Sequence, residues 1–357
     1  MGSVVLSLDA ELGWGHHDLP SPPADRVEAG RNGWRDSLDL LDEYDVPATW
    51  AVVGHLFLHD CDGRHNSHPT PEEWFARERR AWSDRRELRF APNLVAAIAD
   101  ADADHEIGCH TFSHVEFGDP RTTPEIARAE LVASLEAAAA ASIQPEMTSV
   151  VFPRNSVGHR DVIAQCGFTC YRGTSPTAEA FGPSAIRKIG YLVGSTPPLV
   201  EPRVDEYGLV DVPASMYLFS FEGPARRAFE LAGRDPVVAA ARRGIDAAAR
   251  RDRVFHLWYH PNNLVTDGDV ARLRAILEHI DRRRSEGGLR VETMADVARR
   301  VTADAGRPAP QSTDALSSQT DAPSSQSKAS SASADATSTA ADATSTAADA
   351  TSADDDR

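Results

Sequence analysis

Two histidines four positions apart, His110 and His114, lie in the stretch "EIGCHTFSH" at residues 106–114. The preceding "HEIG" is typical of a short strand that ends at Gly108, so we place the pair on a strand-to-helix connection. Active sites gather at such connections in parallel α/β folds. Two imidazoles with one carboxylate and an open position form the ligand set of a catalytic divalent metal, most often zinc. Because the chain contains 13 histidines, the pair needs a carboxylate partner before it indicates a metal.

Two carboxylates at the end of the opening strand, in "LSLDAELGWG", supply a candidate partner. Side chains alternate faces along a strand, so Asp9 and Glu11 point the same way and Ala10 points away. Like charges in one small space repel unless a cation sits between them or one carboxylate is protonated. The alternative is that both carboxylates end the strand in open solvent. Together with the histidine pair, they favour a bound divalent cation.

A later stretch, "VFHLWYHPNNL", places His256 and His260 on one face of another strand. His260 ends the strand before a proline, where the chain turns out of the sheet, and we predict it to be the functional one. We interpret His256 as a hydrogen-bonded core residue. In "VFPRNS", Arg154 also follows a strand end; it either pairs with a surface acid or clamps a carboxylate of the acidic cluster.

The elements that position these residues are short apolar runs alternating with amphipathic helices. The predicted strands lie at 3–8, 47–54, 149–153, 168–173, 208–213 and 254–260, and helices at 124–142 and 269–284. Strands that alternate with helices indicate a parallel sheet covered by helices. We find no evident linker before residue 303, which favours one α/β domain over residues 1–303. Residues 59–92 interrupt the pattern and are predicted to be an insertion that shapes a substrate site.

The final residues, 304–357, are mostly Ala, Ser, Thr and Asp. Asp335, Asp342 and Asp349 recur every seven residues, but no large apolar residues accompany them as a coiled coil requires. Such a segment cannot bury enough apolar surface to offset its ordering entropy, so we predict a disordered acidic tail.

The net charge of −17 argues against nucleic acid as a partner, because basic residues are not gathered into a patch with aromatics. Only Lys188 and Lys328 are lysines, and an acidic chain with so little lysine resembles proteins of salt-loving cells. No uninterrupted apolar run approaches the ~18 residues of a membrane span. The N-terminus lacks a basic, apolar leader, so we expect a cytoplasmic protein. The four cysteines form no CxxC pair, and we assign them no disulfide.

Taken in order, these stretches resemble the polysaccharide deacetylase family, the metal-dependent hydrolases of N-acetyl sugars. The resemblance covers most of residues 3–300 and rests on "PATWAVVG", "FPRNS", "VFHLWYHPNNL" and, above all, on "HTFSH" preceded by "HEIG". It implies a distorted, incomplete (β/α) barrel of about seven strands.

The resemblance also implies roles for the first group of residues. His110 and His114 match the family's two metal-binding histidines, and Asp9 matches its general base. The family has a second, metal-binding Asp directly after the base, where this chain has Ala10. We expect Glu11, on the same strand face as Asp9, to replace it. The expected cofactor is one divalent ion, Zn²⁺ first, with Co²⁺ or another divalent ion as alternatives.

The remaining roles concern the base, the leaving group and the substrate. Arg154 matches the arginine that holds the base, and His260 matches the histidine that acts as acid. Trp14, Asn155 and Trp258 are the expected substrate contacts, with plain packing an equal alternative for Trp258. No oligomeric state is predicted.

The implied reaction starts with a metal-bound water, whose pKa falls towards ~7. Asp9 takes its proton, and His260 protonates the leaving amine, so that an N-acetylated amino sugar or glycan yields acetate and a free amine. Two alternatives stay open. One is a related C–N hydrolase on the same scaffold, such as a deformylase of a lipid-linked sugar or an enzyme that opens cyclic ureides. The other is a carbohydrate-binding module that has lost the metal, which Ala10 favours and Glu11 disfavours.

Overall fold

The computed structural model describes residues 1–143, 147–175, 194–219 and 235–305. Met1–Pro308 forms one compact unit. Its last helix continues to Ala305, two residues past the predicted boundary at 303. The disordered tail was predicted over residues 304–357, of which those from 306 onward lie outside the described residues, as do both lysines.

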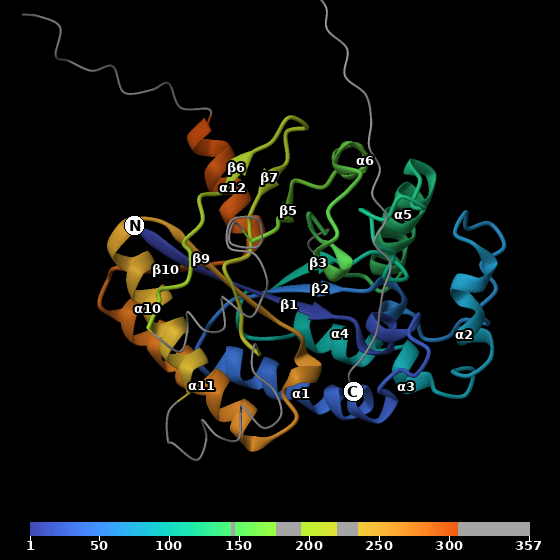
Figure 1. Ribbon diagram of the computed structural model, residues 1–357, viewed down its shortest axis with the longest axis horizontal. Helices are drawn as coiled ribbons and strands as arrows, with labels where there is room; N and C mark the ends of the chain where they lie inside the picture. Colours follow the sequence, from blue (N-terminus) through green and yellow to red (C-terminus); the bar gives the residue numbers. More distant parts are fainter. Residues whose placement is uncertain (144–146, 176–193, 220–234, 306–357) are drawn as a thin grey trace, which may run out of the picture. The chain divides into compact units, whose positions relative to one another are not determined.

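A single curled sheet forms the centre of this unit (Figure 1). Its strands in the described residues are β1 (Gly2–Ala10), β2 (Thr49–Val52), β3 (Glu106–Cys109), β4 (Ser149–Val151), β5 (Cys170–Arg172), β6 (Arg203–Val204), β7 (Val210–Asp211), β8 (Met216–Tyr217), β9 (Val254–Tyr259) and β10 (Leu289–Glu292). Their order is β6-β7-β5-β4-β3-β2-β1-β9-β8, with β10 beside β1. All pairs are parallel except β6 with β7.

The strand order confirms the predicted distorted and incomplete (β/α) barrel. Within the described residues the order runs from β6 to β8 and the two end strands do not pair, so this part of the sheet does not close. Seven of the described strands have three or more residues, the number expected, whereas β6, β7 and β8 are two-residue pairings at or near the two ends.

Strand β1 lies near the middle of the sheet, between β9 on one side and β2 and β10 on the other. All nine of its residues are buried. Val4, Leu6 and Leu8 join the main hydrophobic core, whereas Val5 packs in a second, smaller apolar cluster. Because strand side chains alternate, Ser7 and Asp9 share the face of Val5. The strand therefore sends its apolar even-numbered residues into the main core and its polar residues towards the opposite side.

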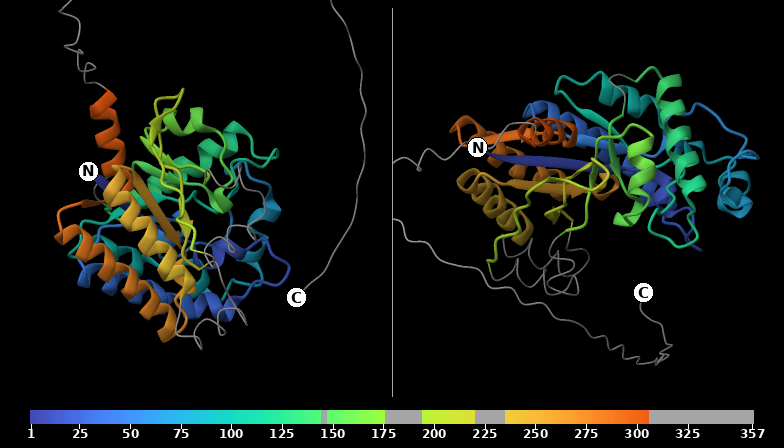
Figure 2. Two further views of the ribbon diagram at one scale, coloured as in Figure 1. Left: turned by 60° about the vertical axis from the view of Figure 1, so that its left-hand side comes forward. Right: turned by 90° about the horizontal axis from the view of Figure 1, so that it is seen from above.

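Helices cover the outside of the sheet (Figures 1 and 2). They are α1 (Ala24–Glu43), α4 (Pro92–Ala99), α5 (Pro124–Ala140), α6 (Arg160–Gln165), α10 (Pro236–Arg251) and α11 (Asp267–Ser285). Helix α12 (Met294–Ala305) packs on the other face, where Met294, Val297 and Ala298 join the smaller apolar cluster of Val5. Thr123 caps α5 by accepting a hydrogen bond from the backbone N–H of Ile126, with Pro124 as the first helical residue. None of the described helices combines the length and apolar character needed to cross a bilayer.

Short 3-10 turns follow four of the strands at their carboxyl ends. These are η1 (Leu12–His16) after β1, η2 (Gly54–Phe57) after β2, η4 (Pro153–Asn155) after β4 and η5 (Pro261–Asn263) after β9. The predicted insertion, residues 59–92, lies beyond η2 and contains η3 (Glu72–Phe75), α2 (Ala76–Arg79) and α3 (Arg86–Arg89). The carboxyl ends of parallel strands meet at one edge of a sheet, so these turns bring distant residues together.

Candidate active site

Glu11, His110 and His114 meet at the carboxyl edge of the sheet. Oε2 of Glu11 lies 3.0 Å from Nε2 of His114 and 3.4 Å from Nε2 of His110. All three side chains are buried, and their donor atoms lie within 4.8 Å of one another. The structure therefore brings together the carboxylate from the end of β1 and both imidazoles from the loop after β3.

The hydrogen bonds around His110 fit a metal ligand. Its Nδ1 lies 2.8 Å from the carbonyl oxygen of Val151, a contact in which Nδ1–H donates and Nε2 keeps a free lone pair. That buried Nε2 has no hydrogen-bond partner among the described residues. Ligands about 2.1 Å from one ion, at tetrahedral or octahedral angles, are roughly 3.0–3.4 Å apart. The distances from Glu11 to the two imidazoles match this spacing, so the three residues could hold a divalent ion.

The electrostatics favour the metal-binding protonation states of Glu11 and His114. Burial would raise the pKa of Glu11, but His260, His110 and His114 outweigh it and hold the pKa well below its usual range. Burial lowers the pKa of His114, although Glu11 opposes that shift. A carboxylate beside a neutral imidazole is the metal-binding form of both groups.

Asp9 pairs with an arginine that the sequence did not indicate. Nη1 and Nη2 of Arg172, the last residue of β5, donate to Oδ1 and Oδ2 of Asp9 at 2.6 and 2.7 Å. Both residues are buried. Burial would raise the pKa of Asp9, but Arg172, with smaller contributions from His110 and His260, lowers it. Asp9 is thus held as a carboxylate in a fixed orientation.

The predicted partner, Arg154, points elsewhere, and that prediction is wrong. Its guanidinium donates to Oδ1 of Asp18 at 2.7 Å and to Oε1 of Glu116 at 2.8 Å, and its side chain is 40% exposed. Arg154 lies in the η4 turn with a left-handed φ of 51°, which carries its side chain to the surface acids. This is the surface pairing that the sequence left as the alternative.

A buried chain of hydrogen bonds supports Arg172 from behind. Its Nη1 also donates to Oγ of Ser7 at 3.0 Å, and Ser7 in turn lies 2.9 Å from Nε2 of His256. Nδ1 of His256 donates to the carbonyl oxygen of Val212 at 3.1 Å. Burial, with a contribution from Arg172, lowers the pKa of His256 to about 3, so the ring is neutral. His256 is therefore the hydrogen-bonded core residue that was predicted.

His260 lies beside the carboxylates of both Glu11 and Asp9. Its Nε2 lies 3.5 Å from Oε1 of Glu11 and 3.8 Å from Oδ2 of Asp9. The side chain is 24% exposed, so it reaches both the carboxylates and the solvent. Its backbone N–H donates to Oδ1 of Asn263, which also accepts from the hydroxyl of Tyr217.

The three predicted substrate contacts are placed differently from one another. Trp14 is 1% exposed, and its indole N–H donates to the carbonyl oxygen of Arg89, so the insertion covers it and its faces cannot receive a sugar. Trp258 is half-buried, with the guanidinium of Arg172 4.5 Å from its ring centroid. Asn155 is half-buried too, and its Oδ1 accepts from Nη2 of Arg172 at 3.0 Å. Trp258 and Asn155 thus border the Asp9–Arg172 pair, while the prediction for Trp14 is wrong.

Left-handed backbone conformations cluster in these loops. Leu12, Thr111, His114, Arg154 and Asn155 all have φ between 44° and 65°. Side-chain-bearing residues adopt this region at a cost of order 1–3 kcal/mol, and such residues concentrate at functional sites. The loops are therefore held in one shape by the surrounding structure.

A second buried carboxylate holds the loop between the two histidines. Glu130, on α5, accepts hydrogen bonds from the backbone N–H and the hydroxyl of Ser113 at 2.7 and 2.6 Å. The indole N–H of Trp74, from the insertion, donates to the hydroxyl and carbonyl oxygens of Ser113 at 3.0 and 3.1 Å. Sequence reasoning missed both Glu130 and Arg172. A charged residue within an apolar run, as in "FTCYRG", was the available signal for Arg172.

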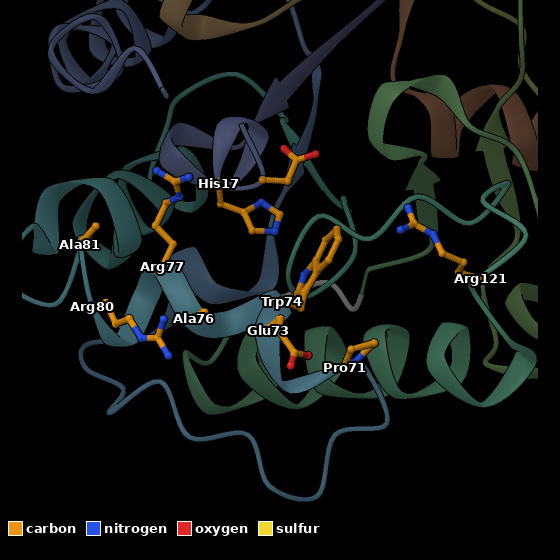
Figure 3. Close-up of a pocket in the computed structure, with 10 residues that line it drawn as sticks. His17, Pro71, Glu73, Trp74, Ala76, Arg77, Arg80, Ala81 and Arg121 are labelled. Atoms are coloured by element: carbon orange, nitrogen blue, oxygen red, sulfur yellow. The ribbon is translucent and has the colours of Figure 1, made fainter. Parts of the chain in front are cut away.

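A pocket of about 550 Å³ lies between the insertion and the loops that carry the site (Figure 3). It is lined by His17, Asp18, Pro71, Glu73, Trp74, Ala76, Arg77, Arg80, Ala81 and Arg121. The ring of His17 lies 6.4 Å from that of His114, centroid to centroid, which connects the pocket to the ligand cluster. Burial lowers the pKa of His17 to about 4, so this ring is neutral.

Comparisons with known proteins give a family match and a similar fold. Residues 19–171 match the family model described as "Polysaccharide deacetylase". A solved structure of a putative polysaccharide deacetylase from Mycobacterium smegmatis is 17% identical, with a TM-score of 0.56 over 86% of this chain and 92% of that one. No curated protein matches the sequence.

Two further solved structures are similar at lower scores. A probable polysaccharide deacetylase from Pseudomonas aeruginosa PAO1 is 14% identical, with a TM-score of 0.48 over 83% of this chain and 89% of that one. A structure titled "Puue Allantoinase" is also 14% identical, with a TM-score of 0.48 over 84% of this chain and 90% of that one. At such identities a structural likeness supports the fold, and here only the Mycobacterium structure scores high enough to do so.

Proposed function

Because residues 19–171 match the polysaccharide deacetylase family model, we propose that the protein is a metal-dependent hydrolase that removes an N-acetyl group from an amino sugar or glycan. The observation that carries this proposal is the convergence of Glu11, His110 and His114 beside the ionised Asp9 and the partly exposed His260. A base, an acid and a ligand set within one site are the groups that amide hydrolysis requires.

Glu11, His110 and His114 would hold the ion. Two imidazole nitrogens and one carboxylate oxygen suit zinc, and Co²⁺ accepts the same ligands. When bound, such an ion polarises the amide carbonyl and makes water more acidic. Glu11 would take the place of the family's second Asp, and this is supported by the proximity of its carboxylate and that of Asp9 to the same His260 ring.

Asp9 acts as the general base in this proposal. Its carboxylate is ionised, and both oxygens are fixed by Arg172, so that Oδ2 faces His260 at 3.8 Å. A proton from the attacking water would pass to this carboxylate as the carbon–oxygen bond forms. Since Arg172 also keeps the pKa of Asp9 low against the effect of burial, the carboxylate is ready to accept the proton at neutral pH.

His260 acts as the general acid. Its ring lies at the solvent-facing side of both carboxylates and packs beside Trp258, with 5.7 Å between ring centroids. It would protonate the amine as the carbon–nitrogen bond breaks. The products are then acetate and a free amino sugar, and the proton count balances because Asp9 has taken one proton from water and His260 has given one to nitrogen.

The pocket under the insertion is the proposed binding region for the rest of the glycan. Trp74 is half-buried and presents an aromatic surface beside His17 and Glu73 (Figure 3). Sugar rings pack on aromatic faces while their hydroxyls hydrogen-bond to charged side chains. Because Trp74 also bonds to Ser113, between the two histidines, a sugar held there would lie beside the ligand loop.

The test is acetate release from a panel of N-acetylated sugars and oligosaccharides by full-length protein loaded with Zn²⁺ or Co²⁺. We expect hydrolysis of at least one substrate, and loss of activity and of bound metal in Glu11→Ala and His114→Ala. Glu201→Ala removes an exposed carboxylate and serves as the control. Release of formate alone would reassign the acyl group. Sugar binding without bound metal or hydrolysis would replace the enzyme with a carbohydrate-binding module.

A further inference from the structure

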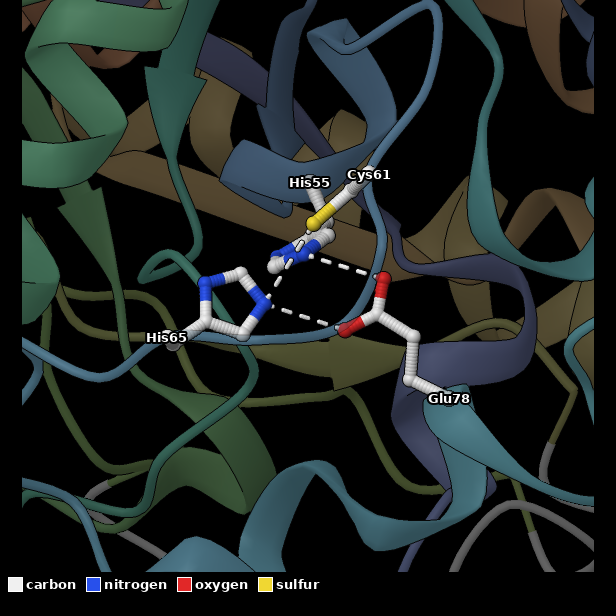
Figure 4. A group of neighbouring side chains, drawn as sticks. All are labelled: His55, Cys61, His65 and Glu78. Carbon is white, nitrogen blue, oxygen red and sulfur yellow. Dashed lines mark hydrogen bonds and ion pairs between the residues drawn. The ribbon is translucent and has the colours of Figure 1, made fainter.

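A second group of metal-ligating side chains lies outside the site described above, where the insertion leaves β2. It consists of His55, Cys61, His65 and Glu78, whose donor atoms all lie within 4.8 Å of one another (Figure 4). His55 belongs to η2 and Glu78 to α2, and the other two lie in the loop between them. The spacing is His-x5-Cys-x3-His-x12-Glu.

His55 is oriented as a metal ligand would be. Its Nδ1 lies 3.3 Å from the carbonyl oxygen of Phe112, and with Nδ1–H as the donor its Nε2 turns a lone pair towards the cluster. This Nε2 is buried, lies 3.3 Å from Oε1 of Glu78, and has no hydrogen-bond partner among the described residues. With Nδ1–H as the donor, a lone pair of Nε2 faces a carboxylate oxygen of Glu78, and a cation between the two atoms would remove their repulsion.

The loop brings in a thiol and a second imidazole. Sγ of Cys61 lies 3.5 Å from Nε2 of His65 and accepts the backbone N–H of Gly63 at 3.3 Å. Gly63 has a φ of 72°, and a Cβ there would meet the side chain of Arg79, so the turn between the two ligands requires glycine. Backbone N–H groups that point at a sulfur support its negative charge, as they do around metal-bound thiolates.

Glu78 supplies the fourth ligand and is itself supported. Its Oε2 lies 3.1 Å from Nε2 of His65, while Oε1 accepts from Nη2 of Arg89 at 2.6 Å. Arg89 also donates to the carbonyl oxygen of Cys61 at 2.7 Å. Arg89 thus ties the loop in place and binds Oε1, which also faces His55, while Oε2 faces His65 and is the oxygen available to bind an ion.

We propose that His55, Cys61, His65 and Glu78 bind a structural zinc ion. Ligands at about 2.0–2.3 Å around a tetrahedral ion are roughly 3.3–3.7 Å apart. The contacts of His65 with Cys61 and Glu78 are 3.5 and 3.1 Å, and that of His55 with Glu78 is 3.3 Å, close to this spacing. A thiolate and a carboxylate balance the charge of a divalent ion, and the sulfur favours zinc over Mg²⁺ or Ca²⁺. Four protein ligands leave no open position, which distinguishes a structural site from a catalytic one.

The proposed ion would fasten the insertion to the sheet and steady the neighbouring site. The ring of His55 lies 4.2 Å from that of Phe112 and 4.2 Å from that of Trp14, centroid to centroid. Phe112 lies between His110 and His114 in the chain, and it also accepts the hydrogen bond from His55. Fixing His55 therefore fixes the loop of the two histidines.

The experiment starts from full-length protein expressed with zinc. Its metal content is measured, and the absorption spectrum of the Co²⁺-substituted protein is recorded. We expect two ions per chain, one lost in Cys61→Ser and the other in His114→Ala. A thiolate-to-cobalt charge-transfer band should appear and vanish only in Cys61→Ser, because the Glu11 site has no sulfur. Cys166→Ser removes another half-buried thiol that belongs to neither cluster and should leave the band unchanged.

Two results would overturn the proposal. One is a Co²⁺-loaded protein without a sulfur band, and the other is a band that persists in Cys61→Ser. Limited proteolysis provides a second measurement in case Cys61→Ser folds poorly, since chelation of the wild-type protein should expose residues 59–92 to cleavage and added Zn²⁺ should restore protection. The inference does not rest on the proposed deacetylation, because an inactive protein can still show the band.

Discussion

Asp9 receives both of its charged hydrogen bonds from Arg172, a residue 163 positions later in the chain. The pair joins the end of β1 to the end of β5 across the inside of the curled sheet. A base held in this way has one orientation and one protonation state. Its environment is supplied by the fold and not by neighbours in sequence.

Replacing Arg172 should therefore damage both catalysis and stability. In Arg172→Gln the carboxylate of Asp9 stays buried without its partner, which costs about 3–5 kcal/mol of unfolding free energy. We expect kcat to fall by about 100-fold with little change in KM, because the base loses its position and not its substrate. Arg154→Gln is the control, since its exposed ion pairs contribute about 1 kcal/mol or less. Equal losses in kcat for the two variants would contradict the assignment.

Gly15 gives a way to disturb the ligand cluster without touching a ligand. A Cβ at this position would lie 2.1–2.8 Å from the carboxylate atoms of Glu11, so Gly15→Ala must displace that side chain. We expect the variant to lose the metal of the Glu11 site while its far-ultraviolet circular dichroism stays native. Gly288→Ala is the matched control, because its nearest neighbour is Ala249 at 3.8 Å. Wild-type metal content in Gly15→Ala would show that Glu11 is not a ligand.

Trp74 should affect substrate binding more than turnover. Loss of its aromatic surface in Trp74→Ala removes a stacking contact of about 1 kcal/mol or somewhat more, which raises KM by about tenfold. Trp74→Phe keeps a ring but loses the hydrogen bonds to Ser113, so we expect an intermediate KM. Tyr207→Ala, which removes an aromatic side chain beside Arg160, should leave KM unchanged. Steady-state kinetics on an N-acetylated oligosaccharide test this, and an unchanged KM in Trp74→Ala would exclude the pocket.

Glu106 makes folding stability depend on pH. Burial raises the pKa of this carboxyl, although hydrogen bonds from Ser149, Ala295 and Thr49 partly oppose the rise. The fold thus favours the protonated form, whose stabilisation is complete below the unfolded pKa and is lost as pH rises through the folded pKa. Glu106→Gln should remove this decrease in the free energy of unfolding, whose slope is at most about 1.4 kcal/mol per pH unit. Urea unfolding from pH 4 upward measures the free energy of unfolding of both proteins. Parallel plots of this free energy against pH for wild type and Glu106→Gln would refute the prediction.

The sequence predicted the barrel, and it predicted that Glu11, His110 and His114 lie together, because both depend on local patterns. Apolar runs marked the main strands, and the alternation along the first strand placed Asp9 and Glu11 on the same side, where both now lie near His260. The histidine spacing marked the loop after β3. Roles in catalysis, the zinc ion and the cytoplasmic location stay predictions.

What the sequence could not supply are contacts between distant segments. Arg172 was missed because its partner lies on another strand, and Arg154 was chosen because it follows a strand end in the same way. Trp14 was predicted to contact the sugar because no feature of the sequence around it indicates that the insertion covers it. The Cys61–His65 pair was overlooked because the cysteines were considered only for CxxC motifs and disulfides.

The site draws on the ends of β1, β3, β5 and β9, whereas the family match spans residues 19–171. A recombinant fragment trimmed to those limits would keep both imidazoles of the ligand loop but lose Asp9, Glu11 and His260, and it would stop one residue short of Arg172. Such a fragment would be inactive because it lacks part of the site, and its inactivity would say nothing about the activity of the full-length protein. Truncation screens and domain swaps with this protein should therefore start at its first strand and extend beyond β9.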